Sequence, residues 1–353
     1  MKGIVFPGNR KVELRDFEEP TPGPGEVVLE IKASGMCGSD LHVYRSQGGG
    51  PALAASLGLG GDGRAVIAGH EPCGIVIARG PEVPERMARI GARVMVHHYD
   101  GCGTCSSCRQ GWAQLCKSGF TVYGITGDGA HAPYMKVPVN TLVALPDELN
   151  FAEGAAISCG TGTAYGAIRR MDMPGGKTMA VFGQGPVGLS ATMLGTATGT
   201  RIIAVDISEE RLELAKSFGA DSVVNAANVD PIEVIHELTN GQGADYAMEC
   251  SGQPDARLAS IRSTRTWGTV CFVGEGNDVT IDVSPDLLRR QLTLIGSWTF
   301  STIGQGECAS FCAEHKVPVD DLFTHRYKQS QADEAYRLFD TQTTGKGVFL
   351  FST

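Results

Sequence analysis

A glycine-rich turn between two short apolar stretches constrains the fold of this chain more than any other feature. Residues 177–182 are apolar and precede Gly183-Gln184-Gly185-Pro186-Val187-Gly188, and a helical stretch then leads to a second apolar run that ends at Asp206. The pattern G-x-G-x-x-G alone is weak evidence in a chain with 47 glycines. A strand before it, a helix after it and an acid at the tip of the next strand complete the dinucleotide-binding pattern.

Each glycine of this turn has a physical role in such a unit. Gly183 permits the tight turn, Gly185 lets a pyrophosphate approach the helix N-terminus, and Gly188 lets the helix pack on the sheet. Asp206 can accept hydrogen bonds from both ribose hydroxyls and repels a 2′-phosphate, which favours NAD. Arg211 follows five residues later and could accept such a phosphate, so NADP remains an alternative.

Strand-like and helix-like stretches alternate from this turn to about residue 295. Such alternation predicts an α/β fold with a doubly wound parallel sheet. Residues 1–150 read instead as short strands separated by turns, and a length of 353 residues suits two domains.

A cysteine-rich segment precedes the dinucleotide unit. It reads Cys102-Gly103-Thr104-Cys105-Ser106-Ser107-Cys108, and Cys116 follows. Four thiolates at this spacing can surround one Zn²⁺ in a closed tetrahedral shell, which is typical of a structural site. An iron–sulfur cluster and a pair of disulfides are the alternatives.

Two further clusters combine metal-ligand residue types. The first is Cys37-Gly38-Ser39-Asp40-Leu41-His42, directly after a strand-like run, and the second is Gly69-His70-Glu71. Taken alone, the first could be a buried cysteine beside a surface histidine, and the second a solvated ion pair at a strand start. Between them, residues 47–68 read as a loop with one helical turn at 52–57, which is either functional or a tolerated insertion.

Composition and charge exclude several classes of partner. A net charge of −9 argues against nucleic acid and anionic membranes. The first residues are too soon broken by proline for a secretory signal, and no apolar run approaches the roughly 20 residues that span a bilayer. The expectation is therefore a cytoplasmic protein, in which the 11 cysteines serve as ligands or nucleophiles rather than disulfides.

Together with Cys159, these motifs resemble the zinc-dependent medium-chain alcohol dehydrogenases along essentially the whole chain. The resemblance implies a GroES-like, β-rich catalytic domain made of residues 1–152 and 296–353, with a structural zinc lobe at about 97–118. Residues 153–295 would form the Rossmann domain that binds NAD.

The resemblance also implies roles for individual residues. The catalytic zinc would be bound by Cys37, His70 and Cys159, and the structural zinc by Cys102, Cys105, Cys108 and Cys116. Near the catalytic zinc, Glu71 would be a carboxylate able to approach the metal, Asp40 would orient His70, and Ser39 and His42 would begin and end a proton relay. Toward the cofactor, Thr163 and Val273 would hold the nicotinamide, and Lys346 would lie near the pyrophosphate.

The implied activity is hydride transfer between NAD and a primary, secondary or polyhydroxy alcohol, by a homodimer or homotetramer. Cys159 resembles the alcohol dehydrogenases proper, whereas Gly38 and Thr324-His325-Arg326 resemble the polyol and threonine branch. L-threonine dehydrogenase and glutathione-dependent formaldehyde dehydrogenase are therefore alternatives. A zinc-free reductase of the superfamily and a non-catalytic NAD- or zinc-binding protein are rival interpretations, although the ligand and relay positions are all filled.

Overall fold

The computed structural model of the chain describes residues 1–56, 58, 63–343 and 345–351. The chain forms two compact units: residues 1–159, 301–314 and 323–353 make the first, and residues 160–300 and 315–322 make the second. The predicted domain boundaries, after residues 152 and 295, lie a few residues before the points at which the chain passes between the two units, after residues 159 and 300. At the first boundary the physical reason is that helix α4 (Phe151–Ile157) packs against strands β3 (Glu26–Gly35) and β4 (Glu71–Arg79) of the first unit.

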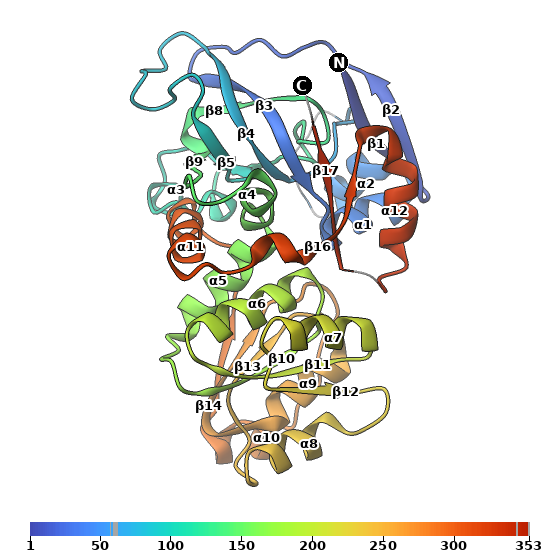
Figure 1. Ribbon diagram of the computed structural model, residues 1–353, viewed down its shortest axis with the longest axis vertical. Coiled ribbons are helices and arrows are strands. Elements are labelled where there is room, and N and C mark those ends of the chain that lie inside the picture. Colours follow the sequence, from blue (N-terminus) through green and yellow to red (C-terminus); the bar gives the residue numbers. More distant parts are fainter. Residues whose placement is uncertain (57, 59–62, 344, 352–353) are drawn as a thin grey trace. The chain divides into compact units, whose positions relative to one another are not determined.

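The second unit is built on a six-stranded parallel sheet with the order β12–β11–β10–β13–β14–β15. Its strands are β10 (Thr178–Phe182), β11 (Arg201–Asp206), β12 (Ser222–Asn225), β13 (Ala244–Glu249), β14 (Thr264–Phe272) and β15 (Thr293–Gly296). Strands β10 to β14 are labelled in Figure 1. Counted along the chain, this is the order 3-2-1-4-5-6 of dinucleotide-binding folds. The prediction of a doubly wound parallel sheet is therefore confirmed.

Helices of the second unit begin at local sequence signals. The side chain of Ser208 accepts a hydrogen bond from the backbone of Arg211, Asp230 does the same for Ile232, and α6 begins with proline. These helices are α5 (Gly160–Met171), α6 (Pro186–Ala197), α7 (Glu209–Ser217), α8 (Pro231–Leu238), α9 (Pro254–Ser263) and α10 (Val283–Asp286), with 3-10 turns η3 (Leu288–Arg290) and η4 (Val319–Leu322).

The first unit is built on a seven-stranded sheet with the order β16–β17–β3–β4–β5–β9, in which β8 also pairs with β3. Besides β3 and β4, its strands are β5 (Arg93–Val96), β8 (Tyr134–Pro138), β9 (Leu142–Ala144), β16 (Phe323–Tyr327) and β17 (Lys346–Leu350). Because β17 runs antiparallel beside β3, residues late in the chain complete a sheet that begins at residue 26 (Figure 1).

Smaller elements surround this sheet. The paired strands are β1 (Lys2–Gly8) with β2 (Lys11–Asp16), and β6 (Tyr99–Asp100) with β7 (Thr121–Val122). The helices, besides α4, are α1 (Gly38–Arg45), α2 (Gly49–Ser56), α3 (Ser106–Arg109), α11 (Thr302–His315) and α12 (Ala332–Asp340), with 3-10 turns η1 (Ala113–Leu115), η2 (Val139–Thr141) and η5 (Gln329–Gln331). None of the helices in the described residues has the length and apolarity needed to cross a membrane.

Helix α2 corrects the prediction for residues 47–68. It begins at Gly49, earlier than the single turn predicted at 52–57, because the first residue of the helix fits where a side chain could not. A Cβ on Gly49 would lie 2.2 Å from the carbonyl oxygen of Phe6 in β1. Beyond the helix, Arg64 binds both carboxylate oxygens of Asp128, at 3.0 and 2.9 Å. Residues 57 and 59–62 of the predicted loop lie outside the described residues.

Trp267 in β14 has a backbone conformation that side chains rarely adopt. Its φ is +62°, and its side chain is 70% exposed, so little packing offsets the strain. The residue lies where the β13–β14 register shifts, between the pairs Ala244–Thr264 and Tyr246–Thr269.

We expect Trp267→Gly to have a higher thermal midpoint than Trp267→Ala by about 2 °C. Both variants remove the indole, but only glycine also removes the Cβ. A Cβ in this left-handed conformation destabilises the fold by roughly 1 kcal/mol. Differential scanning calorimetry of the two variants measures the difference. Equal midpoints would show that the left-handed conformation at residue 267 carries no strain.

Candidate metal and dinucleotide sites

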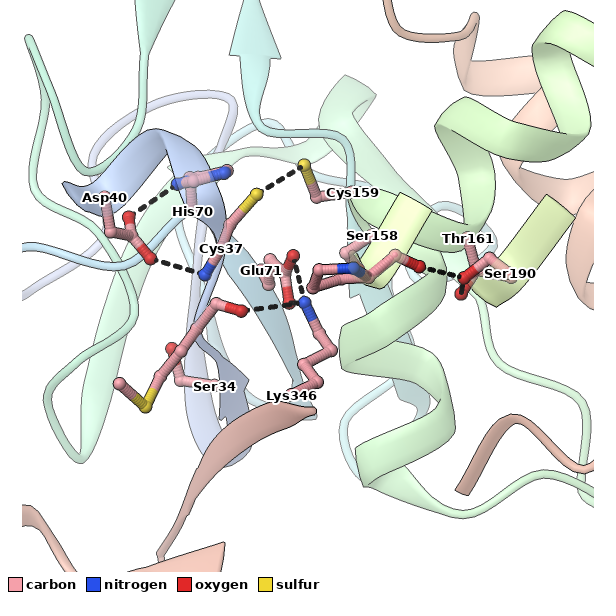
Figure 2. A network of polar contacts seen from close by, with 12 residues as sticks. Ser34, Cys37, Asp40, His70, Glu71, Ser158, Cys159, Thr161, Ser190 and Lys346 are labelled. Carbon is pink, nitrogen blue, oxygen red and sulfur yellow. Dashed lines mark hydrogen bonds and ion pairs between the residues drawn. The ribbon is translucent and has the colours of Figure 1, made fainter. Parts of the chain in front are cut away.

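Four buried side chains of the first unit bring metal-ligand atoms together. Cys37, His70, Glu71 and Cys159 each offer one such atom, and these atoms all lie within 4.8 Å of one another (Figure 2). The two sulfur atoms are 3.8 Å apart. Tetrahedral coordination with Zn–S bonds of about 2.3 Å also separates two sulfur ligands by about 3.8 Å. The donor set and its spacing therefore fit a zinc ion.

Helix α1 explains why Cys37 is placed there. Cys37 is the residue at which the helix is capped, and its backbone N–H donates a 2.9 Å hydrogen bond to Oδ2 of Asp40. The other oxygen, Oδ1, lies 2.8 Å from Nδ1 of His70. Because a carboxylate only accepts, Nδ1–H of His70 donates, which turns Nε2 toward the metal-ligand cluster. Burial alone would raise the pKa of Asp40, but the charge and hydrogen bond of His70 lower it to about 2.

A hydrogen bond joins the two thiols of the cluster. The hydrogen bond from Cys159 lowers the pKa of Cys37 well below its ordinary value, and the same bond raises the pKa of Cys159. One thiolate is therefore stabilised even without a metal. A divalent cation in the cluster would displace the protons of the thiols, since thiolates are the form that binds metal.

Glu71 is paired with Lys346. The ammonium Nζ lies 2.6 Å from the carboxylate and donates a 2.8 Å hydrogen bond to the carbonyl oxygen of Met36. Lys346 is only 1% exposed, and although burial would lower its pKa, Glu71 raises it. The structure thus places the ammonium of Lys346 beside the metal-ligand cluster. The expected contact between Lys346 and the cofactor pyrophosphate stays a prediction.

The two residues of the expected proton relay lie on α1. The hydroxyl of Ser39 is 4.0 Å from Sγ of Cys37 and is half-buried, whereas His42 is exposed one helical turn later. Residues three apart on a helix lie on the same side, so Ser39 and His42 share one face of α1, and their proton relay stays a prediction.

The second cluster is formed by the cysteines around α3 and η1. The Sγ atoms of Cys102, Cys105, Cys108 and Cys116 lie within 4.8 Å of one another. All 11 cysteines of the chain are free, and Sγ of Cys105 is 3.9 Å from Sγ of Cys116, far beyond a disulfide bond of about 2.05 Å. A Cβ on Gly101 would lie 2.7 Å from Sγ of Cys108, so the fold-back of this segment requires glycine.

The glycine-rich turn of the second unit is tightly packed at Gly183 and Gly188 but open at Gly185. A Cβ on Gly188 would lie 1.8 Å from the carbonyl oxygen of Gly183, so helix α6 approaches the strand as closely as glycine allows. Gly183 has φ +87°, which also favours glycine. A Cβ on Gly185 would meet nothing within 4 Å. The N-terminus of α6 is therefore open on the side where an anion would bind.

Asp206 at the tip of β11 is held by backbone groups. Its Oδ1 accepts hydrogen bonds from the N–H of Ile207 at 2.8 Å and of Ser208 at 2.9 Å, and its Oδ2 accepts one from the N–H of Gln184 in the glycine-rich turn. The bond to Gln184 could not be read from the sequence pattern. It ties the phosphate-binding turn to the expected ribose-binding acid.

Other predicted cofactor residues are spread over the second unit. Thr163 is buried on α5, and Val273 follows β14, where its N–H donates to the carbonyl oxygen of Glu249. Arg211 lies on α7, and its Nε is buried without a hydrogen-bond partner among the described residues.

One further histidine lies close to the metal-ligand cluster, although no motif of the sequence points to it. His98 is buried, its ring centroid is 5.2 Å from that of His70, and its Nδ1 lies 2.8 Å from the carbonyl oxygen of Ser158. The available signal was its position two residues after the end of β5, since residues that follow strands are often site residues.

Comparison with known proteins agrees with this geometry. Residues 23–147 match the alcohol dehydrogenase GroES-like domain, and residues 186–313 match the zinc-binding dehydrogenase domain. The uncharacterized zinc-type alcohol dehydrogenase-like protein YphC of Escherichia coli (strain K12) is 40% identical over 354 residues, with 99% of each chain covered. Sorbitol dehydrogenase of Bacillus subtilis (strain 168) is 31% identical, covering 95% of this chain and 92% of its own.

A solved structure extends the similarity to three dimensions. Alcohol dehydrogenase TADH from Thermus sp. ATN1 superposes with a TM-score of 0.88 at 26% identity, over 99% of both chains. The fold and the cysteine–histidine cluster define a metal-dependent oxidoreductase with a dinucleotide-binding domain. More specifically, the chain belongs to the zinc-type alcohol dehydrogenase family. The predicted family, fold class and enzyme class are thus confirmed, and zinc and NAD are the cofactors expected of a member.

We expect Cys105→Ser to remove one bound zinc and to lower the thermal midpoint by more than about 5 °C, because metal binding contributes folding free energy. Cys37→Ser is the matched control: it should also lose one zinc, from the other cluster, with a smaller change in stability. Elemental analysis and calorimetry measure both quantities. An unchanged midpoint for Cys105→Ser would contradict a structural role for this cluster.

Proposed function

We propose that this protein is an NAD-dependent zinc alcohol dehydrogenase, which transfers a hydride between NAD and a primary, secondary or polyhydroxy alcohol to form the aldehyde or ketone. The observation that carries this proposal is the buried cluster of Cys37, His70 and Cys159. Three protein ligands leave a tetrahedral zinc one open position, which is the pattern of catalytic sites.

The residues around this cluster have distinct tasks in the proposed reaction. Cys37, His70 and Cys159 hold the zinc, which supplies Lewis-acid polarisation of the substrate oxygen when bound. Asp40 keeps Nε2 of His70 directed at the metal through its 2.8 Å hydrogen bond to Nδ1. Ser39 accepts the alcohol proton and His42 releases it to solvent, which their half-buried and exposed positions on α1 support.

The cofactor is assigned to the second unit. The pyrophosphate binds at the N-terminus of α6, beside the open face of Gly185, and Asp206 accepts hydrogen bonds from the ribose. Three backbone N–H groups hold the carboxylate of Asp206 at the strand tip, so its negative charge is fixed where a 2′-phosphate would lie. This placement favours NAD over NADP, although Arg211 lies on the helix that follows.

The cysteine cluster of residues 102–116 is assigned a second zinc, which gives two ions per chain. Four sulfur ligands leave no position for substrate, so this ion stabilises the lobe around α3 and η1. The alternative of an iron–sulfur cluster is disfavoured by membership of a zinc-type family.

The protein is further proposed to be a cytoplasmic homo-oligomer. Strand β15 lies at the edge of the six-stranded sheet, and its Leu294 is 38% exposed. An apolar sheet edge is normally covered, and pairing with a second copy would cover it. The free state of all 11 cysteines suits the reducing cytosol. Sedimentation velocity should therefore report a dimer or tetramer, and a monomer at micromolar concentration would contradict this part of the proposal.

Within the alcohols, a polyol is the favoured substrate class, because the sorbitol dehydrogenase of Bacillus subtilis is 31% identical over nearly the whole chain. A screen of zinc-loaded protein with NAD over primary, secondary and polyhydroxy alcohols, with L-threonine included, tests the proposal. We expect turnover that Cys37→Ser abolishes while the protein stays folded. Full activity in Cys37→Ser would refute the catalytic assignment of the cluster.

Two variants of Asp206 separate charge from hydrogen bonding in cofactor choice. We expect Asp206→Asn to raise the ratio of kcat/KM with NADP to that with NAD about tenfold, because the repulsive charge is lost. Asp206→Gly should raise it further, because the ribose also loses its acceptor. Steady-state kinetics with both cofactors give the ratio, and an unchanged ratio in both variants would mean that Asp206 does not contact the ribose.

A further inference from the structure

A chain of buried hydrogen bonds continues beyond the metal ligands into the first unit. The hydroxyl of Tyr336, on α12, donates to Oδ2 of Asp40 at 3.2 Å. Nε2 of His131 lies 2.7 Å from the same hydroxyl, and the hydroxyl of Ser34 in β3 lies 2.7 Å from Nδ1 of His131. Ser34, His131 and Tyr336 are all 0% exposed, so water does not compete for these bonds.

The chemistry of the groups fixes the direction of every bond in this chain. The carboxylate of Asp40 only accepts, so Tyr336 must donate its one proton to it. The hydroxyl oxygen of Tyr336 can then only accept from His131, which requires the proton of the neutral imidazole on Nε2. Nδ1 of His131 is left as an acceptor, and Ser34 donates to it. Ser34 therefore donates to His131, His131 donates to Tyr336, and Tyr336 donates to Asp40.

Packing holds the two central rings of the chain in place. The ring of Tyr336 lies edge-on to Phe6 at 4.5 Å and packs against Tyr44 at 5.7 Å and Phe349 at 6.1 Å. The ring of His131 lies against Gly69, where a Cβ would be 2.3 Å from Nδ1. Gly69 directly precedes the metal ligand His70. The ring of His131 is therefore in direct contact with the backbone next to that ligand.

We propose that Tyr336 and His131 are positioning residues of the catalytic metal site, acting on His70 through Asp40. This inference rests on the proposed catalytic zinc. Asp40 receives three hydrogen bonds: from Cys37 at 2.9 Å and Tyr336 at 3.2 Å on Oδ2, and from His70 at 2.8 Å on Oδ1. The N–H of Cys37 and the hydroxyl of Tyr336 together fix the carboxylate plane, and that plane sets the direction of the imidazole of His70.

The test is the rate at which zinc passes from the fully loaded protein to a chromophoric chelator. Tyr336→Phe keeps the packed ring and removes only the hydroxyl. We expect zinc to leave the catalytic site about tenfold faster, since partners of metal ligands commonly change metal affinity by 10–100-fold. Zinc at Cys102, Cys105, Cys108 and Cys116 should leave at the wild-type rate, which makes the second site an internal control.

Tyr44→Phe is the matched control, because it removes a hydroxyl from the same aromatic group without touching any described hydrogen bond to Asp40. Its release rates should equal those of the wild type. Cobalt(II) substitution gives an independent readout: the ligand-field bands of the catalytic site should shift in Tyr336→Phe but not in Tyr44→Phe. Ser34 lies at the end of the hydrogen-bond chain farthest from Asp40. Ser34→Ala should therefore accelerate zinc release from the catalytic site less than Tyr336→Phe does.

The possible failures are distinguishable. Equal release rates in Tyr336→Phe, Tyr44→Phe and wild type would overturn the inference and leave the proposed function intact. Equal acceleration at both metal sites would also overturn it, since that result reports general loosening of the fold. If Cys37→Ser bound as much zinc as the wild type, the proposed catalytic zinc and this inference would be refuted together.

Discussion

The metal-ligand cluster depends on the buried carboxylate of Asp40, which binds two of the metal-ligand residues at once. Asp40 accepts the N–H of Cys37, which starts helix α1, and the N–H of His70, which comes from the segment before β4. A carboxylate removed from water is costly unless it is well hydrogen-bonded, and these partners meet that cost. The same side chain thus caps a helix and orients a metal ligand. Because both groups bind one carboxylate, Asp40 keeps Cys37 and His70 next to each other.

Much of this arrangement could be predicted because it follows from local patterns. The doubly wound sheet followed from apolar runs that alternate with helices and from the spacing of Gly183, Gly188 and Asp206. The four-cysteine cluster followed from the spacing of its sulfur atoms along one short segment. Cys37, His70 and Cys159 are far apart in sequence, and only their likeness to a family suggested that they meet.

The remaining features depend on long-range packing that no local pattern encodes. Lys346 carries a basic side chain near the end of the chain, yet β17 pairs with β3 and brings its ammonium to Glu71. Tyr336 looks like an ordinary apolar position of the amphipathic helix α12, and His131 stands in a loop without a motif. Their hydroxyl and imidazole become informative only when the sheet and the helix place them beside Asp40.

The pairing of β17 with β3 also orders events in time during synthesis. The ligands Cys37, His70 and Cys159 leave the ribosome well before Tyr336 and Lys346, which contact Asp40 and Glu71. Until α12 and β17 have been synthesised, the carboxylates of Asp40 and Glu71 therefore lack these two partners. The last hydrogen bonds around the metal-ligand cluster can form only after residue 346 has been made.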